Sequence, residues 1–180
     1  MNYYIADTHF GHANVLKFDN RPFENVKEMD KVIIDSWNSR VTNKDDIYIV
    51  GDFAYRSEHD YSYYLSKLNG KKHLIIGNHD KDLLKDSKAM EYFTSVDYYL
   101  DIRDNKIRVI LSHYPIAEWE GFYRGSYLVY GHIHNNTDCD AYKLMKKYDK
   151  ALNAGVCINS YAPCTLGELI ENNKVFKRYN

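Results

Sequence analysis

Aspartate, histidine and asparagine residues gather in five short clusters along this 180-residue chain. The clusters contain Asp7, His9, Asp52, Asn78, His79, Asp80, His113, His132 and His134. Imidazole, carboxylate and amide oxygen form a borderline-hard ligand set, which suits Mn²⁺, Fe²⁺ or Zn²⁺ better than metals that prefer thiolates. Two such ions about 3.5–4 Å apart can generate a hydroxide nucleophile and hold a phosphoryl group. The residue types therefore predict metal-assisted phosphoryl chemistry.

Each cluster directly follows a short run of apolar, β-branched or aromatic residues. These runs are Tyr3–Ala6, Ile47–Val50, His73–Ile76, Val109–Leu111 and Leu128–Tyr130. Runs of this length that end in glycine or polar residues are typical of buried strands. Open α/β sheets bind their ligands at the carboxyl ends of the strands, so the five clusters are expected to meet at one sheet edge.

Helical patterns lie between the predicted strands. Apolar residues recur at helical spacing in Val26, Met29, Ile33 and Trp37, and again in Tyr61, Tyr64, Leu65 and Leu68. Alternating strands and helices predict a layered α/β fold. Near the end of the chain, 166–170 and 175–176, joined across Asn172-Asn173, are predicted to form a β-hairpin. The chain shows no internal repeat or linker, which predicts one domain over residues 1–180.

In order along the chain, the clusters resemble the five motif blocks of the calcineurin-like metallophosphoesterase family. The blocks are Asp7-x-His9, Gly51-Asp52, Gly77-Asn78-His79-Asp80, His113 and Gly131-His132-x-His134. The stretches 7–12, 21–23 and 37–38 are similar to a small single-domain bacterial and phage branch of that family. This resemblance implies a four-layer αββα sandwich, in which helices flank two mixed β-sheets.

The resemblance also implies two divalent metal ions and their ligands. The first ion would be held by Asp7, His9 and His134, and the second by Asn78, His113 and His132. Asp52 would bridge the two ions, because a carboxylate offers two oxygens and a negative charge. Mn²⁺ is the favoured ion, with Fe, Zn and Ni as alternatives.

His79 would carry the remaining chemistry without binding metal. The resemblance places it opposite the scissile phosphate, where it would protonate the leaving oxygen or stabilise the transition state. Asp80 would orient the His79 ring through its second nitrogen. A helix N-cap for residues 81–85 is an alternative, compatible role for Asp80.

The implied reaction is hydrolysis of a phosphate ester by attack of a metal-bridging hydroxide. A phosphodiester is favoured, because no cap domain is evident that would enclose a small monoester. Alternatives are a phosphomonoesterase acting on a small phosphorylated substrate and a non-catalytic scaffold for protein–protein binding. A nucleic-acid-binding module without catalysis is a third alternative, and the net charge of −1 speaks against it.

Substrate contacts are less constrained by the sequence. Candidates are Arg21, Arg56 and Arg124, together with His12 and the ligand Asn78. Most arginines are solvated surface residues, which is the alternative for each of these three, and His12 could equally cap a helix over 13–18. The aromatic loop 114–126 is a candidate rim that stacks on a nucleobase, or a segment that packs onto the body.

Bulk properties bound the class of protein. No apolar run is long enough to span a bilayer, and the first residues do not resemble a signal peptide. The three cysteines form no C-x-x-C pair, which argues against a thiolate zinc site. We therefore expect a cytoplasmic enzyme that acts on a small phosphate ester, nucleotide or nucleic-acid-derived, without a membrane or an obligate protein partner.

Overall fold

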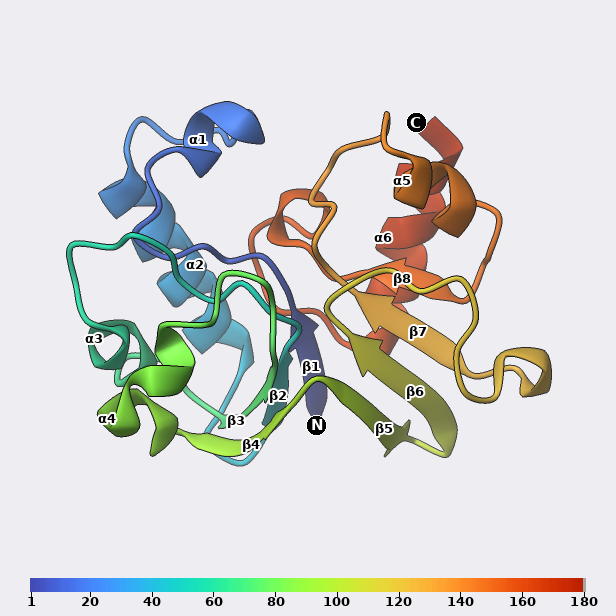
Figure 1. The fold of residues 1–180 in the computed structure, drawn as a ribbon, viewed down its shortest axis with the longest axis horizontal. Helices are drawn as coiled ribbons and strands as arrows, with labels where there is room; N and C mark the ends of the chain where they lie inside the picture. The colour runs from blue at the N-terminus through green and yellow to red at the C-terminus, as the bar shows by residue number, and fades with distance from the viewer. Residues whose placement is uncertain (180) are drawn as a thin grey trace.

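The computed structural model describes residues 1–179, in which two four-stranded sheets lie between two groups of helices (Figure 1). The first sheet has the order β1 (Asn2–Ile5), β2 (Asp46–Ile49), β3 (Lys71–Ile75) and β4 (Phe93–Asp97). The second has the order β5 (Tyr99–Asp104), β6 (Ile107–Ser112), β7 (Tyr127–Tyr130) and β8 (Ala151–Asn153). Tyr98 alone separates β4 from β5, so the chain passes directly from one sheet to the other.

The helices cover the outer faces of the two sheets. On the side of the first sheet lie α1 (Val15–Phe18), α2 (Val26–Arg40), α3 (Tyr61–Leu65) and α4 (Ser87–Met90). On the side of the second lie α5 (Asp140–Met145) and α6 (Leu166–Tyr179) (Figure 1). Single 3₁₀ turns occur at Leu83–Lys85, Phe122–Arg124 and Val156–Ile158. Among the described residues, no helix is long and apolar enough to cross a membrane.

Alternation along the strands divides the apolar residues into three layers. In β1, Tyr3 and Ile5 pack against the helices of the first sheet, whereas Tyr4 packs between the sheets. In β7, Leu128 packs in the outer layer beside α5, whereas Val129 packs between the sheets. Successive side chains on a strand point to opposite faces, and both faces of each sheet are covered. Because both faces of these strands are buried, apolar residues occupy successive positions along them.

The predicted strands and helices are confirmed, with shifts of one to three residues at their ends. The five apolar runs form β1, β2, β3, β6 and β7. The first helical pattern forms α2, where Met29, Ile33 and Trp37 are fully buried. The second forms α3, which ends before Leu68.

The predicted αββα sandwich is confirmed, and only one of its sheets is mixed. All neighbouring strands of the first sheet are parallel. In the second sheet, β5 runs antiparallel to β6, and the remaining pairs are parallel. The antiparallel pair is closed by Asn105 and Lys106, both with positive φ (46° and 72°), as a two-residue type I′ turn requires.

The C-terminal hairpin prediction is wrong, because residues 166–179 form the helix α6. A capping box starts the helix: Glu168 accepts from the Thr165 N–H, and the Glu168 N–H donates to the Thr165 hydroxyl. Asn173 is no turn residue, since its buried side chain accepts from the Asn153 N–H and donates to the Asn153 carbonyl. The single domain over 1–180 stays a prediction, and Asn180 lies outside the described residues.

Candidate metal centre

The predicted ligands follow the carboxyl ends of five strands and converge where the two sheets meet. Asp7 and His9 follow β1, Asp52 follows β2, Asn78 follows β3, His113 follows β6, and His132 and His134 follow β7. The parallel pairing of β1 with β2, of β2 with β3 and of β6 with β7 brings these ends to one edge. The sandwich therefore collects ligands that lie up to 127 positions apart in the sequence.

The backbone around the ligands is held in an uncommon conformation. Five of them, Asp7, His9, Asp52, His132 and His134, have φ between 49° and 71°. The left-handed region costs a non-glycine residue about 1–2 kcal/mol, and such strain persists only where the surroundings fix it. Gly51 shows how tight the packing is: a Cβ there would lie 2.2 Å from His113 Nδ1.

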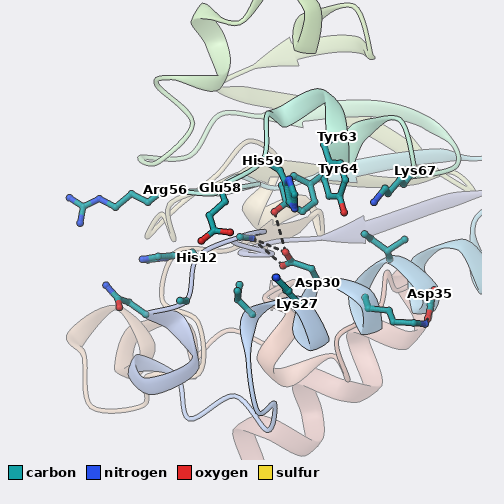
Figure 2. A pocket seen from close by; sticks show the side chains of 16 residues that line it. His12, Lys27, Asp30, Asp35, Arg56, Glu58, His59, Tyr63, Tyr64 and Lys67 are labelled. Carbon is teal, nitrogen blue, oxygen red and sulfur yellow. Dashed lines mark hydrogen bonds and ion pairs between the residues drawn. The ribbon is translucent and has the colours of Figure 1, made fainter.

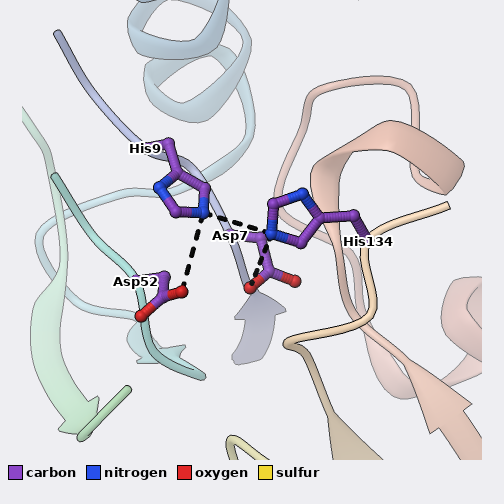
Figure 3. A group of neighbouring side chains, drawn as sticks. All are labelled: Asp7, His9, Asp52 and His134. Carbon is purple, nitrogen blue, oxygen red and sulfur yellow. Dashed lines mark hydrogen bonds and ion pairs between the residues drawn. The ribbon is translucent and has the colours of Figure 1, made fainter. Parts of the chain in front are cut away.

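One group of ligands comprises Asp7, His9 and His134 (Figure 3), which we call the first half-site. The His9 Nε2 and His134 Nε2 atoms lie 3.2 Å apart, and His134 Nε2 lies 3.8 Å from Asp7 Oδ1. Together with Asp52, these residues place one ligand atom each within 4.8 Å of one another. Nitrogens and carboxylate oxygens converge here on a common point.

The second half-site comprises Asn78, His113 and His132. His113 Nε2 and His132 Nδ1 lie 3.0 Å and 2.9 Å from the same atom, Asn78 Oδ1. The His113 Nδ1 atom lies 2.9 Å from the Val50 carbonyl and donates to it, so in a neutral ring the lone pair lies on Nε2, the atom near Asn78 Oδ1. The two half-sites thus have the same general composition, but only the first contains a carboxylate of its own.

Asp52 lies between the two half-sites. Its Oδ2 atom is 3.6 Å from His9 Nε2 and 3.6 Å from His113 Nε2. Its Oδ1 atom accepts from the His79 N–H at 2.8 Å, which fixes the carboxylate orientation. One oxygen atom is therefore equidistant from a nitrogen of each half-site.

Several groups in this centre are arranged for a bound cation. Asp7 Oδ2 is buried without a hydrogen-bond partner among the described residues, which in a dry site costs at least about 1–3 kcal/mol. Burial raises the pKa of Asp52, and the neighbouring Asp7 carboxylate raises it further. Burial likewise lowers the pKa of His9 well below its usual range, and the nearby His134 adds to this effect. A neutral His9 imidazole beside mutually repelling carboxylates fits a divalent cation.

Comparisons with known proteins agree with this geometry. Residues 3–153 match the family model described as calcineurin-like phosphoesterase. The chain belongs to the calcineurin-like phosphoesterase family. It is accordingly a hydrolase that acts on ester bonds, takes a phosphate ester as substrate and binds divalent metal, for which the buried Asp and His cluster is the candidate site.

Individual relatives cover most of this phosphoesterase. An uncharacterized protein of Methanocaldococcus jannaschii, MJ1445, is 35% identical over 183 residues, which covers 99% of this chain and 96% of that protein. The gene 66 protein of Mycobacterium phage D29 is 25% identical and covers 74% of this chain and 78% of its own. The crystal structure of AQ665, a protein of unknown function from Aquifex aeolicus, has a TM-score of 0.74 at 30% identity, covering 95% of this chain and 98% of that chain.

An acidic residue that the sequence reasoning missed supports the first half-site of the phosphoesterase. Asp19 accepts from His134 Nδ1 at 2.7 Å, which turns Nε2 toward His9. Burial by itself would lower the pKa of His134, but this hydrogen bond and the Asp7 charge outweigh it and raise the pKa. Asp19 lies ten residues after His9 with no spacing rule that links the two.

Arg21 is not a substrate contact, which corrects the prediction. Its side chain is fully buried and donates to Asp19 Oδ2 at 2.9 Å and 3.0 Å. It also donates to the carbonyls of Asp7 and Thr8 at 2.9 Å and 3.0 Å. A buried guanidinium needs such partners, and here they hold both the Asp7 segment and the carboxylate that orients His134.

Asp80 does not orient the His79 ring, which corrects a second prediction. Its carboxylate accepts from the backbone N–H groups of Asp52, Phe53 and Gly77 at 2.8–2.9 Å. Its side chain caps no helix either. Burial raises the pKa of Asp80, and the three amides oppose that rise. Asp80 thus fixes the loop that carries Asp52, while the ring of His79 packs 4.2 Å from that of Tyr55, between centroids.

The remaining predicted substrate contacts fall in different places. His12 is buried beside the centre, with its ring 5.5 Å from that of His9, and Asn78 lies within the second half-site. Arg56 is exposed, and its guanidinium lies 5.1 Å from the centre of the Tyr55 ring.

Arg124 and the loop 114–126 mostly lie away from the ligands. Arg124 pairs with Glu120, which also pairs with Arg108 near the amino end of β6, whereas His113 follows the carboxyl end. Along β6, Arg108 and His113 are separated by about 16 Å, at 3.3 Å per residue. Trp119 packs into the outer layer beside α5, and only Tyr114 approaches the site, 4.5 Å from the His132 ring. The loop is therefore mainly a packing element, and a contact of Arg124 with substrate stays a prediction.

Proposed function

We propose that this phosphoesterase holds two divalent ions, one in each half-site, and hydrolyses phosphodiesters. The observation that carries the proposal is the position of Asp52 Oδ2, 3.6 Å from a histidine nitrogen of each half-site. When bound, two ions would lower the pKa of a shared water and neutralise charge on the phosphoryl oxygens. Mn²⁺ is the favoured ion, because the ligands are imidazole, carboxylate and amide oxygen.

His79 is the proposed proton donor to the leaving oxygen. Its ring packs edge-on against His9 at 5.5 Å between centroids, so it borders the first half-site. Its backbone N–H donates to Asp52 Oδ1, which ties its position to the shared carboxylate. The ring is partly exposed, as a group that meets substrate must be. General acid catalysis at such a position contributes about 10²–10⁴-fold.

A preference for diesters is supported by two hollows near the candidate ligands (Figure 2 shows the first). One, of about 790 Å³, is bordered by His12, whose ring lies 5.5 Å from that of His9. The other, of about 600 Å³, is bordered by His132 and His134. A diester carries an organic group on each side of its phosphate, and two hollows give each group a place. A monoester would fill one.

The test is hydrolysis of bis(p-nitrophenyl) phosphate and p-nitrophenyl phosphate by chelator-stripped protein, with Mn²⁺, Fe²⁺, Zn²⁺, Ni²⁺ or Mg²⁺ restored in turn. We expect turnover that requires added metal, with Mn²⁺ most effective, and a higher kcat/KM for the diester. A higher kcat/KM for the monoester would reverse the substrate preference. Equal turnover by the stripped and restored protein would contradict the metal-dependent mechanism.

A further inference from the structure

The two sheets have four edge strands, β1, β4, β5 and β8, and β5 differs from the other three. We infer that β5 pairs with β5 of a second copy of this chain, so that the second sheets of the two copies join into one continuous sheet. Figure 1 shows β5 at the border of its sheet, away from the helices. Three features of β5 support this pairing: its free backbone groups, the charges on its outer face and the single register in which those charges match.

The other three edges are closed or interrupted. Beside β1, Tyr4 and Cys164 exchange two backbone hydrogen bonds of 2.8 Å and 3.0 Å. Beside β8, the Asn173 side chain accepts from the Asn153 N–H at 2.8 Å and donates to the Asn153 carbonyl at 3.0 Å. In β4 the register shifts by one residue at Thr94, and a bulge of this kind disrupts further pairing at an edge.

The outward backbone groups of β5 have no such partners. Its antiparallel pairing with β6 is regular up to the turn that Asp104 and Ile107 close. The residues that flank a two-residue turn are hydrogen-bonded to each other, and such pairs alternate along the ladder. The N–H and C=O groups of Tyr99, Asp101 and Arg103 therefore point away from β6, and none has a backbone partner there among the described residues. A regular, open edge is a template for another strand.

Opposite charges alternate on the outer face of β5. Asp101 and Arg103 are both exposed and, being two positions apart, point to the same face. In an antiparallel pair centred on Ile102 of both copies, Asp101 lies opposite the partner's Arg103, and Arg103 lies opposite the partner's Asp101. Each of these pairs exchanges two backbone hydrogen bonds. Opposite charges placed directly across two strands stabilise the pairing.

The same charges exclude the neighbouring registers. A slide of two residues is the smallest step that keeps the backbone bonding pattern. In one direction it places Asp101 opposite the partner's Asp101, and in the other it places Arg103 opposite the partner's Arg103, which is destabilising. The Asp101 carboxylate is also fixed in position by Arg108, which Glu120 holds from the other side at 3.0 Å. The outer face of β5 is therefore complementary to a second copy of itself in one register.

The pairing also covers apolar side chains at the open end of the core between the sheets. Leu100 and Ile102 belong to that core and yet are only half-buried. In the pair, Ile102 lies against the partner's Ile102, and Tyr98, which is 73% exposed, lies beside the partner's turn. Removal of this apolar surface from water adds to the backbone hydrogen bonds.

Both metal centres stay open in this dimer. Ser112, directly before His113, pairs with Tyr99 at the amino end of β5. In the antiparallel arrangement this end lies beside the turn of the partner, so the two centres lie at opposite ends of the joined sheet. The dimer is accordingly independent of the proposed function.

The test is sedimentation velocity of the full chain from about 1 µM to about 1 mM, the range in which weak pairing is measurable. We expect a shift from the mass of one chain to that of two. Arg103→Asp and Asp101→Lys each place like charges in both cross-strand pairs and should raise the dimer Kd about tenfold or more. An equimolar mixture of the two variants restores opposite charges and should form a heterodimer. Arg178→Asp, at an exposed arginine of α6, is the control and should dimerise like wild type.

Circular dichroism checks that each variant is folded. If Asp101→Lys is not, Arg103→Pro takes its place, because proline removes one outward N–H and leaves the hydrogen bonds to β6. A chain that stays monomeric over the whole range would overturn the inference. So would a dimer that Arg103→Asp and Arg103→Pro leave unchanged, or folded charge variants that do not associate when mixed.

Discussion

The two half-sites of this phosphoesterase have similar ligands but very different surroundings. In the first, Asp7 and His9 are buried, and His134 is held by Asp19, which Arg21 holds in turn. In the second, only His113 is buried, and His132 is exposed. The first half-site brings its own carboxylate, whereas the second brings the neutral amide of Asn78.

For the two proposed ions, this difference implies unequal affinity and unequal tasks. Outer partners that orient a ligand typically change metal affinity 10–100-fold, and a carboxylate adds Coulomb attraction that an amide lacks. The first half-site should therefore fill first and retain its ion. The second should exchange its ion more readily and face the solvent and the substrate. Asp52 is the one residue that would serve both ions in the proposed centre.

The largest effect is expected from Asp52→Asn, because it removes the shared charge. The amide keeps the shape but lacks the charge that would hold two cations, so activity should fall by more than the roughly 10²–10⁴-fold expected from loss of a general acid. Metal analysis should show less than two ions per chain, and kcat/KM for bis(p-nitrophenyl) phosphate measures the loss. Normal activity in this variant would show that catalysis does not depend on a carboxylate shared by the two half-sites.

His79→Ala should affect neither half-site and yet lower turnover. Loss of a general acid predicts a fall in kcat of about 10²–10⁴-fold with metal content unchanged. The measurement is kcat alongside ion content per chain. The His79 N–H to Asp52 is a backbone contact, so the variant keeps it. An unchanged kcat would show that protonation of the leaving oxygen does not depend on this ring.

Asp19→Asn should change metal affinity at the first half-site only. It weakens the hydrogen bond that orients His134 and leaves the buried Arg21 without its carboxylate. We expect affinity for the first ion to fall about 10–100-fold, with the second little changed. Titration calorimetry with Mn²⁺ measures both steps. Asp138→Asn, at an exposed residue of the neighbouring hollow, is the matched control; equal effects of the two variants would contradict the role of Asp19.

The smallest expected effect concerns Lys177, which lies outside both half-sites. Its titration should change the stability of the fold without changing metal binding. Burial lowers the pKa of Lys177 to about 8 from 10.5, and its ammonium donates to the carbonyls of Tyr148 and Ala151. Between pH 8 and 10.5, Lys177 binds more protons in the unfolded chain than in the folded protein, so the free energy of unfolding rises with pH. Below pH 8 the residue is protonated in both states, and the full cost of burying its charge destabilises the fold.

The free energy of unfolding of wild type relative to Lys177→Met should therefore rise by roughly 1–3 kcal/mol over that pH range. Urea denaturation at several pH values measures the difference, and Lys147→Met, at an exposed lysine, is the control. A flat difference would show that Lys177 keeps an ordinary pKa in the folded chain.

Much of this fold could be predicted because its signals are local. The apolar runs before Asp7, Asp52 and His113 identify buried strands, and strand ends place the ligand clusters at one edge. The C-terminal helix was missed because the Asn172-Asn173 pair imitates a turn. The capping box Thr165-x-x-Glu168 was the local signal that indicated a helix instead.

The supporting residues could not be predicted in the same way. Asp19 and Arg21 act through a hydrogen-bond chain that exists only once β1 and β7 lie together. A guanidinium such as that of Arg21 is suited to bind phosphate, and only its burial shows that it binds backbone carbonyls instead. Asp80 likewise binds three amides that come from two different loops. Spacing in the sequence carries no information on such contacts.

The most direct test of the two-ion centre is the anomalous difference density of Mn²⁺-soaked crystals. We expect two peaks about 3.5–4 Å apart on either side of Asp52 Oδ2. At low Mn²⁺ the peak beside Asp7, His9 and His134 should be the stronger. A single peak that stays single at saturating Mn²⁺, or two peaks that share no contact with Asp52, would contradict it.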